Sequence, residues 1–157
     1  MATGHDIAMG LRAAYLSMHR QTNSYLAPQK ITADQFVLLA LLAEQDKITQ
    51  QELVRRATSD PNTICAMLVL LEDRGLVTRQ PHPADGRARS VALTRMGHCT
   101  YANLSKQVRT LQNQLLDLFR FEEAENLIEL LGRISEAMVH SENQRDRPKP
   151  GTSEAKT

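Results

Sequence analysis

The feature that most constrains this chain is a change in hydrophobic periodicity directly after Gly75. Before this point, apolar residues recur at steps of three and four, which is typical of amphipathic helices. After it, Leu76–Arg79 and Ser90–Leu93 form short alternating or β-branched runs, and the connection between them contains prolines, an Asp85-Gly86 pair and two arginines. We therefore predict one β-hairpin with a long, basic tip in an otherwise helical chain.

Two short helices with clear start signals precede this hairpin. Thr49 stands three residues before Glu52, in the spacing of a capping box, and opens a helix that continues to Ala57. Asp60 is a favourable N-cap and Pro61 a favourable first residue for the next helix, which ends at the glycine named above. The apolar period turns one side of this second helix toward the core. Its first exposed positions are then Pro61, Asn62, Thr63 and Ala66.

Two helices joined by a turn and followed by an arginine-bearing hairpin are the arrangement of a winged helix-turn-helix. In such a domain the second helix enters the major groove of DNA, and the hairpin, or wing, reaches the backbone or the adjacent minor groove. The charge distribution agrees, because residues 74–95 carry five arginines against Asp85 alone, whereas residues 122–142 carry six glutamates against Arg133 alone. A basic middle and an acidic end indicate that only the middle faces a polyanion.

Four further helices are predicted from apolar periodicity and caps. One begins after Thr32, where Gln35 completes a capping box, and its seven consecutive apolar residues imply burial on most sides. The other three are long and amphipathic, and Pro28 ends the first of them, whereas Thr94 caps the second. Their predicted ranges are Asp6–Tyr25, Arg95–Phe119 and Glu122–His140.

The expected fold class is mainly α with a small β-wing: a winged helix-turn-helix plus a helical dimerisation region, with about six helices and a two- or three-stranded antiparallel sheet. We expect residues 1–30 to form an N-terminal dimerisation helix, 31–94 the DNA-binding domain, 95–141 the C-terminal dimerisation helices, and 142–157 a disordered tail. The apolar stripes of the long helices exceed what the winged domain needs for its own core, which favours a homodimer. The alternative is one extended monomeric core.

The sequence offers no enzyme site. No metal-binding or catalytic spacing joins the five histidines, and neither a glycine-rich phosphate loop nor a GxSxG motif is present. Cys65 and Cys99 lack CxxC or CxxH neighbours, so we interpret them as buried small side chains. We expect no catalysis, no metal and no cofactor. Because no apolar run is long enough to span a membrane, we also expect a cytoplasmic protein.

Two segments resemble a known family. Leu71–Val77 reads LEDRGLV and resembles the LExxGLV segment of the multiple-antibiotic-resistance regulators, the MarR family. Asp85-Gly86-Arg87 followed by Leu93-Thr94 matches the wing signature DxRxxxxxLT of that family. The resemblance extends from Ile7 to Met138. It implies obligate homodimers held by the N- and C-terminal helices, palindromic operators and, often, a small-molecule ligand that weakens DNA binding.

The resemblance also implies roles in the wing. Asp85 should hold the loop by accepting hydrogen bonds, and Arg87 should project into the minor groove, where narrow A·T-rich stretches attract guanidinium groups. Arg89 should contact phosphate or pair with Asp85. Arg74 and Arg79 complete the set of DNA-binding candidates, with Arg79 on phosphate. Taken alone, an Asp-Gly turn with two arginines reads as a solvated loop, and its position after the second helix is what favours DNA.

The second helix carries no cation between Arg56 and Arg74. Asn62 can bind adenine through N6 and N7, and Thr63 can offer its hydroxyl or its methyl group, so an A·T-rich operator is expected. The alternative role of both residues is to cap the first turn.

Sensing and regulation complete the prediction. A small-molecule pocket could use six residues that otherwise belong to core or interface, with an aromatic or lipophilic acid as ligand. They are Tyr15, Met18, His19, Tyr25, Phe36 and His98. The predicted function is a homodimeric, sequence-specific transcriptional regulator, a repressor released from a palindromic operator by a small aromatic ligand. A helical protein-binding adaptor is the alternative, which salt-sensitive DNA binding would exclude.

Overall fold

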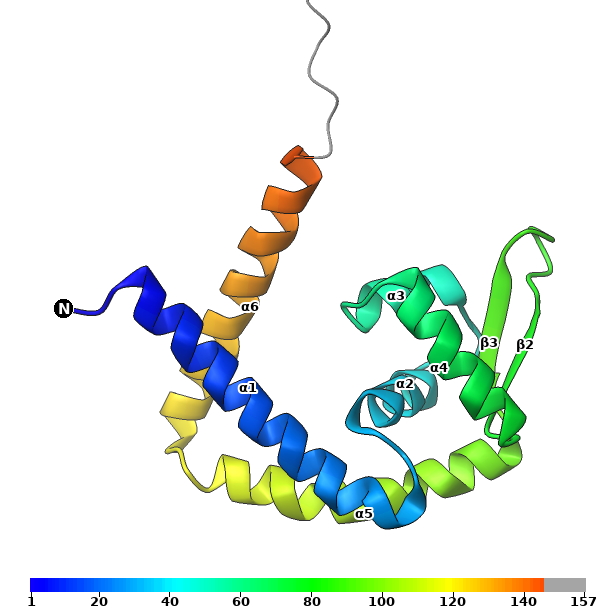
Figure 1. Ribbon diagram of the computed structural model, residues 1–157, viewed down its shortest axis with the longest axis horizontal. Coiled ribbons are helices and arrows are strands. Elements are labelled where there is room, and N and C mark those ends of the chain that lie inside the picture. Colours follow the sequence, from blue (N-terminus) through cyan, green and yellow to red (C-terminus); the bar gives the residue numbers. More distant parts are fainter. Residues whose placement is uncertain (146–157) are drawn as a thin grey trace, which may run out of the picture. The chain divides into compact units, whose positions relative to one another are not determined.

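The computed structural model describes residues 1–145. Their contacts form two compact units, Met1–Gln112 and a second unit that starts at Asn113. Within the described residues the chain folds into six α-helices, one 3-10 turn and one small sheet (Figure 1). This agrees with the predicted fold class. No helix among residues 1–145 is long and apolar enough to cross a membrane.

The first helix, α1 (Gly4–Leu26), begins two residues earlier than predicted. Thr3 and Asp6 form a capping box, in which the Thr3 hydroxyl accepts from the Asp6 N–H (3.2 Å) and the Asp6 carboxylate accepts from the Thr3 N–H (2.8 Å). A 3-10 turn, η1 (Ala27–Gln29), containing Pro28, follows α1. The next helix, α2 (Ala33–Glu44), starts with the capping box of Thr32 and Gln35, as predicted.

The two helices of the predicted helix-turn-helix are α3 (Gln50–Arg56) and α4 (Pro61–Asp73). The second of them, α4, is called the reading helix below. Thr49 caps α3, but the Glu52 carboxylate turns to Arg55 (2.6 Å) and leaves the capping box half formed. In α4, Asp60 is the N-cap and Pro61 the first helical residue. Gly75 follows the C-cap with φ of +70°, the left-handed conformation that a glycine adopts without strain. These start and stop signals are confirmed.

The sheet has three antiparallel strands in the order β1-β3-β2, from β1 (Ile48–Thr49), β2 (Val77–Pro81) and β3 (Arg89–Leu93). The hairpin of β2 and β3 is the predicted wing, although its strands extend further and shorten its tip to residues 82–88. No strand was predicted at Ile48–Thr49, which leads into the helix that Thr49 caps. The segment forms a strand, because Ile48 pairs with Val91 and buries its side chain in the core.

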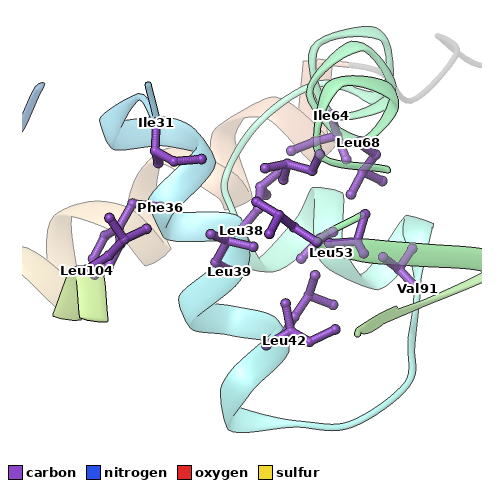
Figure 2. Close-up of a cluster of buried hydrophobic side chains, with 14 of the residues drawn as sticks. Ile31, Phe36, Leu38, Leu39, Leu42, Leu53, Ile64, Leu68, Val91 and Leu104 are labelled. Atoms are coloured by element: carbon purple, nitrogen blue, oxygen red, sulfur yellow. The ribbon is translucent and has the colours of Figure 1, made fainter. Parts of the chain in front are cut away.

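The core is organised around α2, which contributes buried residues on several sides. Leu38 and Leu42 pack in the same cluster as Leu53 of α3 and Val91 of β3, with Ile64 and Leu68 of α4 closing it (Figure 2). Phe36 lies beside Leu104 of α5 (Arg95–Leu116) and stacks on Tyr101, with ring centroids 5.7 Å apart. The hydrophobic effect therefore fixes α3, α4 and the base of the wing on one scaffold.

Hydrogen bonds of Thr94 tie the wing base to the start of α5. Its hydroxyl donates to the Gly75 carbonyl (2.6 Å) and accepts from the Gly97 N–H (2.9 Å). Its own N–H donates to the Leu76 carbonyl (3.0 Å). Gly97 is buried against that same carbonyl, so only a residue without a side chain fits there. The start of α5 is thus locked to the end of α4.

In the second unit, α6 (Phe121–Arg145) is longer than the predicted Glu122–His140. Residues 142–145, expected in a disordered tail, are helical, and the remainder of that predicted tail, 146–157, lies outside the described residues. The preceding helix ends at Leu116 rather than Phe119. Most large apolar side chains of α6 are exposed within one chain, and Ile134 is half-buried.

Candidate nucleic-acid interface

The N-terminal turn of α4 presents an uncharged polar and apolar face. Pro61, Asn62, Thr63 and Ala66 are all exposed, whereas Ile64 and Leu68 of the same helix are fully buried. This exposure pattern follows from the helical period and matches the predicted face. Any molecule that approaches the start of α4 meets these side chains first.

Asn62 and Thr63 differ in how free their polar groups are. The Thr63 hydroxyl donates to Asp60 Oδ2 (2.6 Å), and the Thr63 N–H donates to Asp60 Oδ1 (2.9 Å). These hydrogen bonds lower the pKa of the Asp60 carboxyl, so Asp60 stays ionised and keeps the hydroxyl engaged. Within residues 1–145 the Asn62 amide has no hydrogen bond. The cap of α4 is therefore Asp60 and neither of these two residues, although the Asp60 contact occupies the Thr63 hydroxyl and leaves Thr63 its methyl group to present.

The wing tip is closed by hydrogen bonds around Asp85. Its carboxylate accepts from the Arg87 N–H (3.0 Å), and its carbonyl accepts from the Ala88 N–H (3.1 Å). The His82 N–H closes the loop onto the Ala88 carbonyl (2.8 Å). Arg87 and Arg89 are exposed and form no ion pair within the described residues. The tip and the first residue of β3 thus hold two cations on a defined backbone.

A groove of about 360 Å³ separates the wing from the helix pair. Arg87 and Arg89 line one side of it, and Pro61 at the start of α4 lines another. Among residues 1–145 no carboxylate lines the groove, and the remaining lining residues are Thr49, Gln50, Gln51, Val54 and Ala88. A groove with two arginines, glutamine amides and no negative charge suits the backbone of a polyanion.

The structure places Arg79 differently from the expected phosphate-facing position. Its side chain is 17% exposed and lies against α4, where Nη2 donates to Glu72 Oε1 (3.0 Å) and Nη1 approaches Cys65 Sγ (3.8 Å). A partly buried arginine with a carboxylate partner has little capacity left for a phosphate.

Cys65 is half-buried and Cys99 exposed, so interpreting both as buried side chains was wrong.

Arg74, another DNA-binding candidate, is also engaged inside the chain. Its guanidinium donates to the carbonyl oxygens of Lys30 (2.6 Å) and Gln29 (3.1 Å). These oxygens belong to the last residue of η1 and to the residue that follows it. Arg74 therefore joins the C-terminal end of α4 to the segment between α1 and α2. The four arginines proposed from the sequence to contact DNA therefore divide into Arg74 and Arg79, which bind protein groups, and Arg87 and Arg89, which form no ion pair within the described residues.

The six candidate ligand residues do not form one site. Tyr15 lines a second groove, of about 310 Å³, whose wall also includes Asp34, Val37 and Met67. Phe36 is buried in the core, and His98 is exposed on α5. His19 lies next to Tyr15, with ring centroids 5.5 Å apart, and its Nε2 is 3.3 Å from Asp34 Oδ2. Met18 is exposed and Tyr25 half-buried, and neither lines this groove.

Comparison with known proteins identifies the family. The model of the MarR family matches residues 31–89, which contain the helix pair and most of the wing. The transcriptional regulator HosA of Escherichia coli O111:H- is 31% identical over 107 residues, which span 68% of this chain and 79% of HosA. The chain belongs to the MarR family. It is therefore a transcriptional regulator and not an enzyme, as the sequence predicted.

Solved structures of MarR-family proteins share the fold and include DNA complexes. A cysteine-to-serine mutant of MarR from E. coli in complex with operator DNA matches with a TM-score of 0.75 and 29% identity, covering 82% of this chain and 92% of that one. The transcriptional repressor CouR bound to a 23-mer DNA duplex matches with a TM-score of 0.74 and 27% identity, covering 86% of this chain and 99% of CouR. The winged helix of this family member thus resembles domains that bind duplex DNA.

Proposed function

We propose that this MarR-family protein is a homodimeric repressor that binds an A·T-rich palindromic operator through α4 and the wing. The observation that carries the proposal is the exposed, uncharged start of α4 beside the two free arginines of the wing. The DNA complexes of MarR and CouR support this use of the fold, and the name of CouR supports the repressor role.

The reading helix favours adenine and thymine by its chemistry. A free Asn62 amide can accept from adenine N6 and donate to N7, whereas guanine is read best by arginine or lysine, which the exposed face of α4 lacks. The methyl groups of Thr63 and Ala66 suit the C5-methyl of thymine. In the wing, Arg87 is proposed to enter a narrow minor groove and Arg89 to contact a phosphate, while Asp85 holds the loop.

Replacement of the wing arginine gives the first test. Arg87→Ala is expected to weaken operator binding by about 1–3 kcal/mol, a typical loss for one good groove contact. Folding stability should stay within about 0.5 kcal/mol, because the side chain is exposed. Arg109→Ala removes the same charge from an exposed position on α5 and serves as control. Titrations over a salt series measure both variants, and equal affinities would show that the wing does not touch DNA.

The homodimer is proposed from apolar surface that one chain leaves exposed. The long helices carry large apolar side chains on faces without a partner in the described residues, and surfaces of this kind mark interfaces. A two-fold dimer would bury them and set two reading helices on one duplex. The exposed residues include Ile7 and Met9 on α1, Leu115 and Leu116 on α5, and Phe121, Leu127, Ile128, Leu130, Leu131, Met138 and Val139 on α6.

The effector is proposed to bind in the groove that Tyr15 lines. This groove reaches Thr58, Ser59 and Thr63, the turn before α4 and its first turn, so an occupant could shift the start of the reading helix. Within the part of the chain that the structure describes, its one charged lining residue is Asp34, and no lysine or arginine lines it. This charge disfavours the aromatic acid expected from the sequence. A neutral or cationic aromatic molecule fits better, because it could stack on Tyr15 and pair with the carboxylate.

Two probes of matched shape test the proposed ligand class. At pH 8, where an ordinary imidazole is neutral, millimolar 2-phenylethylamine should weaken operator binding about five-fold or more, a typical coupling between sites. Phenylacetate should have no effect. Asp34→Asn should remove the preference for the amine while leaving DNA binding without probe unchanged. Release by phenylacetate and not by the amine would refute the proposed ligand class.

A further inference from the structure

A single carboxylate connects the reading helix to the wing. Glu72, near the C-terminal end of α4, accepts the backbone N–H of Arg79 at Oε2 (3.1 Å) and the Arg79 guanidinium at Oε1 (3.0 Å). Arg79 belongs to β2, so the two hydrogen bonds fix both the backbone and the side chain of one wing residue. Each hydrogen bond is charge-assisted, and together the two restrain the orientation of Arg79 relative to Glu72 as well as the distance between them.

The guanidinium lies along α4 rather than in solvent. Its Nη1 approaches Cys65 Sγ (3.8 Å), and its Nε is buried without a hydrogen-bond partner among the described residues. The hydrogen bond to Arg79 lowers the pKa of the Glu72 carboxyl, and the same contact raises the pKa of Arg79. Both groups therefore stay charged at neutral pH, and Arg79 is held against one face of the helix.

Arg79 is the last residue of β2 that is held by hydrogen bonds to α4. Val77 is buried in the core, but Gln80 and Pro81, which follow Arg79, are exposed. On the other side, β1 pairs with β3 only at Ser90 and Val91. Beyond these positions the hairpin is a two-stranded ribbon that carries Arg87 at its tip. The direction of that ribbon is set where it leaves the domain, at Arg79.

We infer that Glu72 and Arg79 are positioning residues that hold the wing at a fixed angle to the reading helix, so that Arg87 meets DNA in register with α4. The inference rests on the proposed contact between Arg87 and DNA. A wing held in place before binding loses less conformational freedom when the complex forms. Neither residue needs to touch DNA for its loss to weaken binding.

The sign of the expected effect separates positioning from simple electrostatics. Glu72→Gln removes a negative charge, which by charge alone would raise affinity for DNA. Positioning predicts the opposite, a loss of about three- to ten-fold, which is no greater than the loss expected when the Arg87 contact is removed altogether. Asp73→Asn makes the same charge change at an exposed neighbour and should leave affinity unchanged or slightly higher.

A double-mutant cycle with Arg87→Ala gives the decisive test. Glu72→Gln should weaken binding in the parent protein but change affinity less than two-fold when Arg87 is already alanine. Thermal unfolding of each variant checks that it folds, and Arg79→Gln offers a second way to break the same contact. Equal losses in both backgrounds would show that the effect of Glu72 on binding does not pass through Arg87, and would overturn the inference. No loss in Arg87→Ala itself would refute the wing contact of the proposed function, and the positioning role with it.

Discussion

Gly97→Ala is expected to destabilise the fold by about 3 kcal/mol or more, at the upper end of overpacking effects. A Cβ at this position would overlap the carbonyl oxygen of Leu76 and crowd its carbonyl carbon and the Leu93 side chain. The oxygen cannot retreat at low cost, because it accepts the Thr94 N–H that joins the wing base to α5. Chemical unfolding at fixed protein concentration measures the loss.

Gly86→Ala is the matched control for that substitution. Nothing lies within 4 Å of a Cβ added at Gly86, and its φ is not in the left-handed region, so the stability change should stay within about 0.5 kcal/mol. A Gly97→Ala protein as stable as the Gly86→Ala protein would mean that α5 does not approach Leu76 as closely as described.

Ile128→Glu is expected to turn the proposed dimer into a monomer and to weaken operator binding by about 10²- to 10⁴-fold, the range by which linking two binding modules raises affinity. Ile128 is 66% exposed in one chain, so the substitution should be tolerated in a folded monomer. In the proposed interface the added carboxylate would be buried without a partner, which is strongly unfavourable. Light scattering gives the mass, and titration gives the affinity.

Asn126→Glu places the same charge about 160° away around α6, by the geometry of 3.6 residues per turn. Asn126 is exposed, and this variant should remain a dimer with parental affinity. The proposed interface would be refuted by a dimeric Ile128→Glu protein, or by a parent protein with the mass of one 17.6 kDa chain at micromolar concentration.

Local signals made most of the fold predictable. The caps Thr32 and Asp60 and the left-handed Gly75 act within one helical turn, so the sequence around each is sufficient. Strand β1 was missed because Ile48–Thr49 is too short to show a period, and its pairing with Val91 depends on residues far along the chain. The Thr3 cap was overlooked, although Asp6 stands at the capping-box spacing.

The interface was only partly predictable for the same reason. Exposure at Asn62 and Ala66 follows from the helical period, but charge alone could not separate free arginines from paired ones. Arg74 binds carbonyl oxygens more than forty residues away, and backbone acceptors leave no mark in a sequence. Asp34 lies in the first turn of α2, where an acidic residue is usually explained by its favourable interaction with the helix dipole. Its position in the lining of a groove was therefore not predicted.

We propose that two reading helices, each with an uncharged exposed face, bind one duplex with two-fold symmetry. Selection of bound sites from random duplex DNA by the purified protein tests it most directly. We predict an A·T-rich imperfect palindrome with half-sites centred about 10–10.5 base pairs apart, because symmetric reading helices enter successive major grooves on one face. A G·C-rich consensus, a site without a dyad, or no salt-sensitive enrichment at all, as for a protein-binding adaptor, would contradict it.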